Sequence, residues 1–119
     1  MTTNNFPGIG FVTNGRNWNF FQKLAVTATS FGSNSVDGYQ PDMIITFPTA
    51  MVTFQLEGTG SIQYSFNGIT VDGDMNSNTS GTDGYYSESL VFENRVVSCI
   101  WFKLISGSPT IRVEAWAIR

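Results

Sequence analysis

Short segments in which apolar and polar side chains alternate restrict the fold of this sequence more than any other feature. Residues 52–57 alternate strictly, and related patterns occur in residues 22–30 and 110–118. A period of two places successive side chains on opposite faces of a strand, so each segment has one face suited to burial. Spacing typical of an amphipathic helix does not recur along the chain. The sequence therefore predicts β-strands joined by turns.

Further apolar segments complete the expected set of strands. They are residues 42–47, 61–66, 69–72, 87–93 and 95–105. Asn67-Gly68 is typical of a two-residue type I′ hairpin turn, and residues 95–105 are apolar on both sides, as in a central strand covered on both faces. About eight strands without a helix fit a single antiparallel β-sandwich, with jelly-roll and Greek-key connections both open.

The first 20 residues differ from the rest of the chain. Gly and Asn are frequent there, too frequent for regular structure, yet the segment also carries large apolar rings that need a surface to pack on. The rings that we consider partner-binding candidates are Phe6, Phe11, Trp18 and Phe20. We expect an irregular arm over residues 1–20 and a β-sandwich domain over residues 21–119. The rings pack either on this domain's own core or on a neighbouring subunit.

The residue inventory argues against catalysis. Histidine is absent, which removes the commonest general base and the usual partner of a nucleophilic serine or cysteine. The one cysteine, Cys99, lies in an apolar segment and is expected to be a buried, unreactive thiol. We therefore predict that the protein is not an enzyme, has no catalytic residues and needs no cofactor.

Charge and hydropathy limit the partners. The six Lys and Arg residues are scattered singly among nine Asp and Glu, whereas binding to phosphate backbones requires clustered cations. The start of the chain lacks a basic region followed by an apolar run, and no stretch approaches the ~18–20 apolar residues of a membrane span. We expect no nucleic-acid partner, no membrane partner and synthesis in a cytoplasm.

One acidic segment has the composition of a calcium loop. Asp72, Asp74 and Asn76 carry side-chain oxygens at alternate positions, and Asp83 stands where an EF-hand loop has its last ligand. The match is partial, because Ser77 replaces the required glycine and no helices flank the segment. A solvated polar loop explains the same residues, so no metal site is predicted and calcium stays a weak candidate.

Three aromatic residues are candidates for an exposed binding surface. Trp116 falls on the polar side of its strand, and Tyr85 and Tyr86 end the long polar segment. Exposed Trp and Tyr are frequent in sugar-binding and protein-binding sites. The alternative is structural, with Trp116 covering a sheet or an edge and the two tyrosines closing one end of the sandwich.

The second half of the chain resembles small structural proteins of tailed bacteriophages. The resemblance is carried by the segments Gly60-Ser61-Ile62-Gln63-Tyr64-Ser65-Phe66-Asn67-Gly68, Leu90-Val91-Phe92-Glu93-Asn94-Arg95, Ile100-Trp101-Phe102-Lys103 and Ser106-Gly107-Ser108-Pro109-Thr110-Ile111-Arg112-Val113-Glu114-Ala115-Trp116. Those proteins are β-sandwiches or jelly rolls that decorate or cement the head, or form small parts of the tail and fibres.

This resemblance implies a function by contact. A decoration protein stabilises the capsid by bridging neighbouring subunits, often as a trimer, so the expected partners are capsid or other virion proteins and further copies of the chain. The expected location is the virion, after synthesis in the host cytoplasm. A small tail or fibre component, or a lectin-like module that binds a carbohydrate or receptor, is the alternative.

Overall fold

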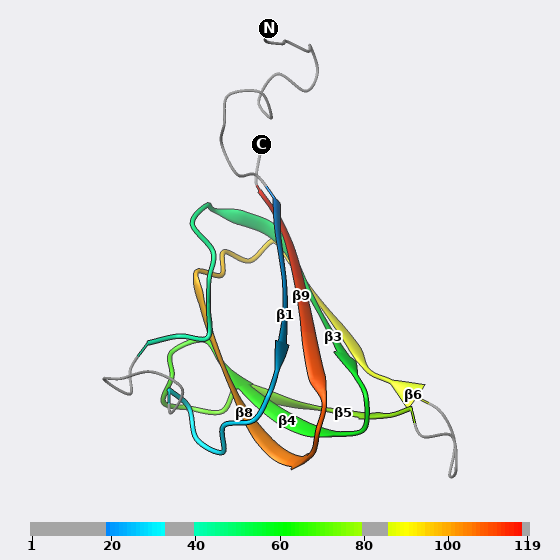
Figure 1. The fold of residues 1–119 in the computed structure, drawn as a ribbon. Helices are drawn as coiled ribbons and strands as arrows, with labels where there is room; N and C mark the ends of the chain where they lie inside the picture. Colours follow the sequence, from blue (N-terminus) through cyan, green and yellow to red (C-terminus); the bar gives the residue numbers. More distant parts are fainter. Residues whose placement is uncertain (1–18, 33–39, 80–85, 118–119) are drawn as a thin grey trace, which may run out of the picture.

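The computed structural model describes residues 19–32, 40–79 and 86–117, which form nine strands and no helix. The strands build two antiparallel sheets that face each other as a sandwich, and Figure 1 shows β1, β9 and β3 on one side and β8, β4 and β5 on the other. No helix long and apolar enough to cross a membrane occurs among these residues.

The two sheets have different numbers of strands. The four-stranded sheet has the order β1 (Asn19–Ala25), β9 (Thr110–Ala117), β3 (Thr49–Glu57), β7 (Ser89–Glu93). The five-stranded sheet has the order β2 (Met43–Ile44), β8 (Cys99–Gly107), β4 (Gly60–Ser65), β5 (Gly73–Asn78), β6 (Tyr86–Ser87). The all-β sandwich that the sequence predicts is confirmed.

The pairing of the strands is nested. β1 pairs with β9, β2 with β8, β3 with β7, and β4 with β5. The chain thus runs as one long antiparallel hairpin whose tip is the β4–β5 connection. Rolling this hairpin up adds the pairs β3–β9 and β4–β8, which is the strand order of a jelly roll.

The core lies between the sheets and is made by the inward side chains of each alternating strand. In β3, Val52, Phe54 and Leu56 are fully buried, as the alternation of residues 52–57 predicts. The other buried apolar side chains are Val26, Ala28, Met43, Ile45, Ile62, Tyr64, Met75, Val97, Ile100, Phe102, Ile111, Val113 and Ala115. Full burial of each large side chain contributes about 1.5–3 kcal/mol of transfer free energy.

The β4–β5 connection differs from the predicted type I′ turn. It spans residues 66–72, and of the Asn67-Gly68 pair only Gly68 has positive φ. The Asn67 carboxamide oxygen accepts hydrogen bonds from the backbone N–H groups of Ile69 and Thr70, and so shapes a longer turn. A side chain that satisfies backbone donors in this way replaces the tight two-residue turn.

The strand expected at residues 95–105 begins later and has one buried face. β8 starts at Cys99, and residues 95–98 are a connection in which Val96 is 60% exposed. Ile100 and Phe102 point into the core, whereas Cys99 is only half-buried, on the outer side. The prediction of a fully buried, doubly covered strand was wrong, because no second layer lies over the outer side of β8 within the described residues.

The boundary of the predicted arm also shifts. β1 begins at Asn19, and Phe20 packs against the core from inside this strand. Phe20 therefore belongs to the sandwich and not to the arm, and it takes the first of the two packings expected for these rings, on this domain's own core. Phe6, Phe11 and Trp18 lie outside the described residues.

The Tyr64 phenol is buried near charged side chains, and its ionisation makes the stability of the fold depend on pH. Its side chain is 6% exposed and meets the ring of Phe54 edge-on at 5.2 Å. Burial, followed by the negative charges of Asp72 and Asp74, raises the pKa of Tyr64 above its usual value. A raised pKa favours the neutral phenol in the folded state relative to the unfolded state.

We predict that Tyr64 lowers stability in alkaline solution. Above pH of about 10 the unfolded chain loses this proton before the folded chain does, so the free energy of unfolding falls as pH rises towards the folded-state pKa. Urea unfolding of the wild type and of Tyr64→Phe, followed from pH 7 upwards, should show a stability difference that is constant below pH of about 10 and declines above it. Parallel curves for the wild type and Tyr64→Phe would contradict the prediction.

Candidate functional site

The four-stranded sheet presents an open outer face. The register of its strands sets Phe21, Glu114, Thr53 and Val91 in one row across the sheet. The row towards the start of β1 contains Asn19, Trp116, Met51 and Glu93. We call the outward side chains of these strands the outer face.

Large apolar side chains are exposed on the outer face. Phe21 is 59%, Val91 56% and Trp116 40% exposed. Phe21 and Trp116 lie on adjacent strands in neighbouring rows, and Val91 lies on the opposite edge strand of the same face, beyond Glu114 and Thr53. A group of exposed apolar side chains of this kind is typical of a contact surface.

Most charged side chains of the outer face are paired with one another. Lys23 and Glu57 form an ion pair at 2.9 Å, and Arg112 and Glu114 form another at 2.9 Å. The Arg112 guanidinium also lies over the Phe21 ring, 5.2 Å from its centroid. Exposed pairs stabilise the fold little, but a partner that covers this face would not leave these ions without a countercharge.

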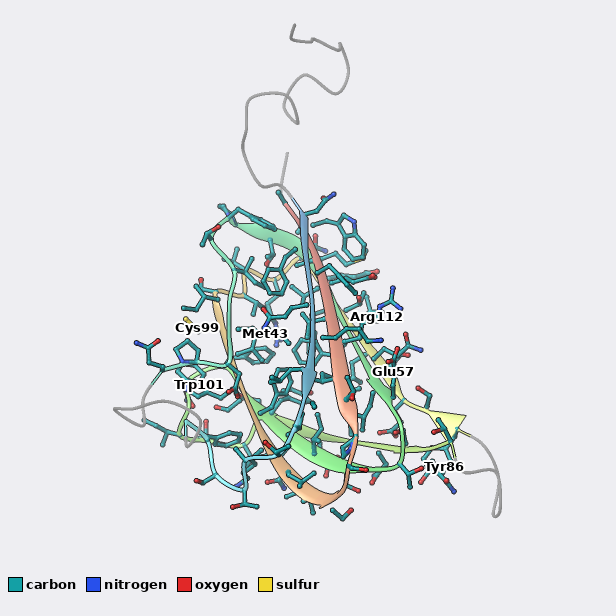
Figure 2. The ribbon with its side chains drawn as sticks, in the orientation of Figure 1. Met43, Glu57, Tyr86, Cys99, Trp101 and Arg112 are labelled. Atoms are coloured by element: carbon teal, nitrogen blue, oxygen red, sulfur yellow. The ribbon has the colours of Figure 1, made fainter. Side chains whose placement is uncertain are left out.

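The aromatic residues predicted to form a binding surface do not come together. Trp116 pairs with Met51 near the start of β3, while Tyr86 in β6 lies beyond the other end, where Ser87 bonds the Leu56 carbonyl. Five residues of strand separate the two ends, roughly 17 Å at about 3.3 Å per residue. Figure 2 shows Tyr86 at the edge of the molecule, away from Arg112 of the outer face. Tyr85 lies outside the described residues.

The acidic segment is largely a strand and not the expected loop. Asp74 and Asn76 are exposed side chains of β5, which continues to Asn78. The Asp72 carboxylate accepts a hydrogen bond from the Phe66 backbone N–H at 2.7 Å. The part of the chain that the structure describes holds no group of three or more acidic, His or Cys side chains placed for a metal ion, and Asp83 falls outside that part.

A hollow of about 490 Å³ opens on the other side of the sandwich. Its lining includes Phe66, Arg95, Val96, Ser98, Cys99 and Trp101. Figure 2 shows Cys99 and Trp101 on the side of the molecule opposite Glu57 and Arg112, with Met43 of the core between them. We call this feature the Arg95 hollow.

Arg95 is positioned by two aromatic rings. Its guanidinium lies 5.4 Å from the centroid of Phe92 and 6.0 Å from that of Phe66. Both rings pack against the core cluster, which fixes the platform under the cation. In the described part of the chain no carboxylate forms an ion pair with Arg95.

A bulge in β3 fixes the backbone of the hollow's rim. The β3–β9 register shifts between Thr49 and Met51, and the extra residue turns the Thr49 side chain inward, where it is fully buried. The Thr49 hydroxyl donates to the Arg95 carbonyl at 2.6 Å and accepts from the Val97 N–H at 2.9 Å. Asn94, at φ 56°, turns the chain into this rim and donates its N–H to Ala50.

Trp101 forms a second wall that is also held in place. A Cβ at Gly68 would lie 2.8 Å from the Trp101 ring, so the indole packs directly on this glycine of the β4–β5 turn. The Ser65 hydroxyl accepts hydrogen bonds from the N–H groups of Asn67 and Gly68, which stabilises the turn under the ring. The β4–β5 turn therefore supports one side of the Trp101 ring, and the rest of the ring lines the hollow.

The sequence did not indicate this hollow. Arg95 was taken as one scattered cation at the start of a strand, and Trp101 as a side chain of a doubly covered strand. The bulge at Thr49 brings the rim together and carries no recognisable sequence pattern. The one available signal was Asn94-Arg95, since Asn is tolerated at positive φ and can end a strand.

Comparisons with known proteins find no relative of this chain. No family model matches the chain, and no curated protein or solved structure matches it. The functional argument therefore rests on the jelly-roll fold, the outer face and the Arg95 hollow.

We predict that Thr49→Val destabilises the fold, because it removes the hydroxyl that holds the rim of the hollow. Valine keeps the shape of threonine but leaves the Arg95 carbonyl and the Val97 N–H without their partner, at a cost of about 1–3 kcal/mol. Urea unfolding should show a lower midpoint at an unchanged slope. Thr53→Val, on the outer face of the same strand, should change stability by less than about 0.5 kcal/mol. Equal effects of the two substitutions would contradict the role of the Thr49 hydroxyl.

Proposed function

We propose that this chain is a non-enzymatic structural protein of a phage virion, a capsid decoration protein that stabilises the head through subunit contacts. The observation that carries the proposal is the outer face, where exposed Phe21, Val91 and Trp116 share a surface whose neighbouring charges are paired. The jelly-roll strand order supports it, because viral capsid domains use this architecture.

The outer face has the properties of an assembly contact. Covering each exposed large apolar side chain would contribute up to about 1.5–3 kcal/mol. A decoration protein meets several equivalent capsid subunits, so modest contacts multiply through the high effective concentration on the particle. A homo-oligomer, with a trimer preferred, presents several such faces at once. A small tail or fibre component would use the same face, and the head is the placement that we propose.

The segment before β1 joins the sandwich next to this face. Asn19, the first residue of β1, is the register partner of Trp116. Residues 1–18 are therefore attached at the Trp116 end of the outer face, and we propose that Phe6, Phe11 and Trp18 extend the same contact to a neighbouring subunit.

We predict that the double variant Phe21→Thr, Val91→Thr loses assembly. Threonine suits an exposed strand position and removes the apolar contact without touching the core. Light scattering should show the mass falling towards the 13.1 kDa monomer, and binding to undecorated phage heads should weaken at least about tenfold, an expected loss of 1.4 kcal/mol or more.

The matched control is the double variant Ile69→Thr, Ile105→Thr. It removes two exposed apolar side chains away from the outer face, Ile69 of the β4–β5 connection, 81% exposed, and Ile105 of β8, 54% exposed. This control should keep the wild-type mass and head binding. Equal behaviour of both double variants, or a wild type that neither oligomerises nor binds heads, would refute the contact function of the outer face.

A chain without residues 2–18 tests the arm separately. The deletion ends before β1 and leaves Phe20 in the core, so the sandwich should keep its unfolding midpoint. We predict a lower oligomer mass and weaker head binding than for the full chain, both measured as above. Unchanged mass and unchanged binding would remove the arm from the contact.

A further inference from the structure

We propose that the Arg95 hollow is a binding site for an acidic sugar, a pyranose ring that carries a carboxylate. This inference stands on a different surface from the outer face and does not depend on the virion function. It follows from the size of the hollow, its single charge, its aromatic wall and its fixed rim.

The size of the hollow suits a small ring. Its volume of about 490 Å³ falls in the range of ~300–1,000 Å³ that is usual for small-molecule sites. The lining combines aromatic and aliphatic residues with a few polar ones, among them Ser98 and Arg95. Such a mixture suits a ligand with apolar C–H faces and polar substituents.

The positive charge of the hollow favours an anionic ligand. Among the residues that the structure describes, Arg95 is the one charged side chain in the lining of the hollow. The Arg95 guanidinium lies within 6.0 Å of two aromatic ring centroids, and a guanidinium can bind a carboxylate through two parallel hydrogen bonds. Asp72 does not neutralise it, because its carboxylate accepts the Phe66 N–H and forms no ion pair with Arg95.

The aromatic wall selects a flat or ring-shaped body. Trp101 is partly buried against Gly68 and lines the hollow beside Phe66. An indole offers a large apolar surface that packs on the C–H face of a sugar ring. The hollow therefore joins a ring-packing wall to a carboxylate-binding cation, and an acidic pyranose has both complementary groups.

The rim is organised before any ligand arrives. The buried Thr49 hydroxyl bonds both Arg95 and Val97, and the Phe66 and Phe92 rings support the cation. Binding then costs little ordering of side chains or backbone. A terminal carboxylate of a peptide shares part of this chemistry, so a short peptide is one of the probes that test the sugar assignment.

The first measurement is a titration of the full chain followed by amide NMR signals. The probes are glucuronic acid and N-acetylneuraminic acid, with glucose and galactose as uncharged counterparts. We expect saturable shifts in residues 94–101 with the acidic sugars and at least about tenfold weaker binding of the neutral ones. Absence of binding by both acidic sugars, or equal binding of acidic and neutral sugars, would overturn the proposal.

Substitutions test the role of Arg95. Arg95→Gln should weaken binding of the acidic sugars at least about tenfold. The affinity of Arg95→Lys should lie between those of the wild type and Arg95→Gln, because lysine keeps the charge without the paired donors. Lys103→Gln removes a cation from the same sheet outside the hollow and should bind as the wild type does. Equal losses in Arg95→Gln and Lys103→Gln would show nonspecific attraction and overturn the site.

Cys99 supplies an independent readout. It is the one cysteine of the sequence and it lines the hollow, so an occupied site should slow its alkylation by N-ethylmaleimide. Slowing by acidic sugars in the wild type and in Phe21→Thr, Val91→Thr, but not in Arg95→Gln, would support the proposal. Unchanged alkylation at saturating sugar, or stronger protection by a short peptide with a free carboxylate, would overturn the sugar assignment.

Discussion

The Phe54 ring packs between the two sheets, and both candidate surfaces depend on this packing. Its fully buried ring lies 5.1 Å from the Phe92 centroid in the same sheet, and 5.2 and 5.7 Å from Tyr64 and Phe102 in the opposite sheet. Edge-to-face contacts of this kind contribute about 0.5–1.5 kcal/mol each beyond the burial of area. The cluster fixes the distance between the layers, and its outermost members, Phe66 and Phe92, form the platform on which the Arg95 guanidinium rests.

The sequence predicted those parts of the fold that follow from alternation alone. In β9, and in β3 beyond its bulge, each side chain lies on the face that a period of two assigns to it, including Trp116 on the outside. The predictions were wrong where a single polar side chain reorganises the backbone. Asn67 replaces a two-residue turn with a longer one, and Thr49 draws residues 95–97 out of the expected strand. Neither effect is visible in hydrophobic spacing, because it depends on which backbone groups a folded neighbour brings within reach.

The candidate sites divide in the same way. Trp116 could be found from its strand, since an aromatic ring on the polar side of an alternating segment has to face outward or meet another layer. Phe21 and Val91 become part of the same surface only through the strand order, which places β1 and β7 on either side of β9 and β3. The Arg95 hollow needed still more information, because its lining combines two connections with Cys99 and Trp101 of β8, and the bulge at Thr49 holds its rim.

The outer face and the Arg95 hollow differ in whether their arginine has an ion-pair partner, and that difference decides what each surface can bind. On the outer face Arg112 is stacked on Phe21 and paired with Glu114, so its charge is satisfied within the chain. A partner there gains chiefly from covering apolar side chains, and shape decides the fit. Arg95 also lies near two rings, those of Phe66 and Phe92, but it forms no ion pair with a described carboxylate. A cation that rests near two rings and has no ion-pair partner among the described residues favours a ligand that brings the anion itself, so an arginine beside aromatic rings serves contact on one side of the sandwich and, as we propose, recognition on the other.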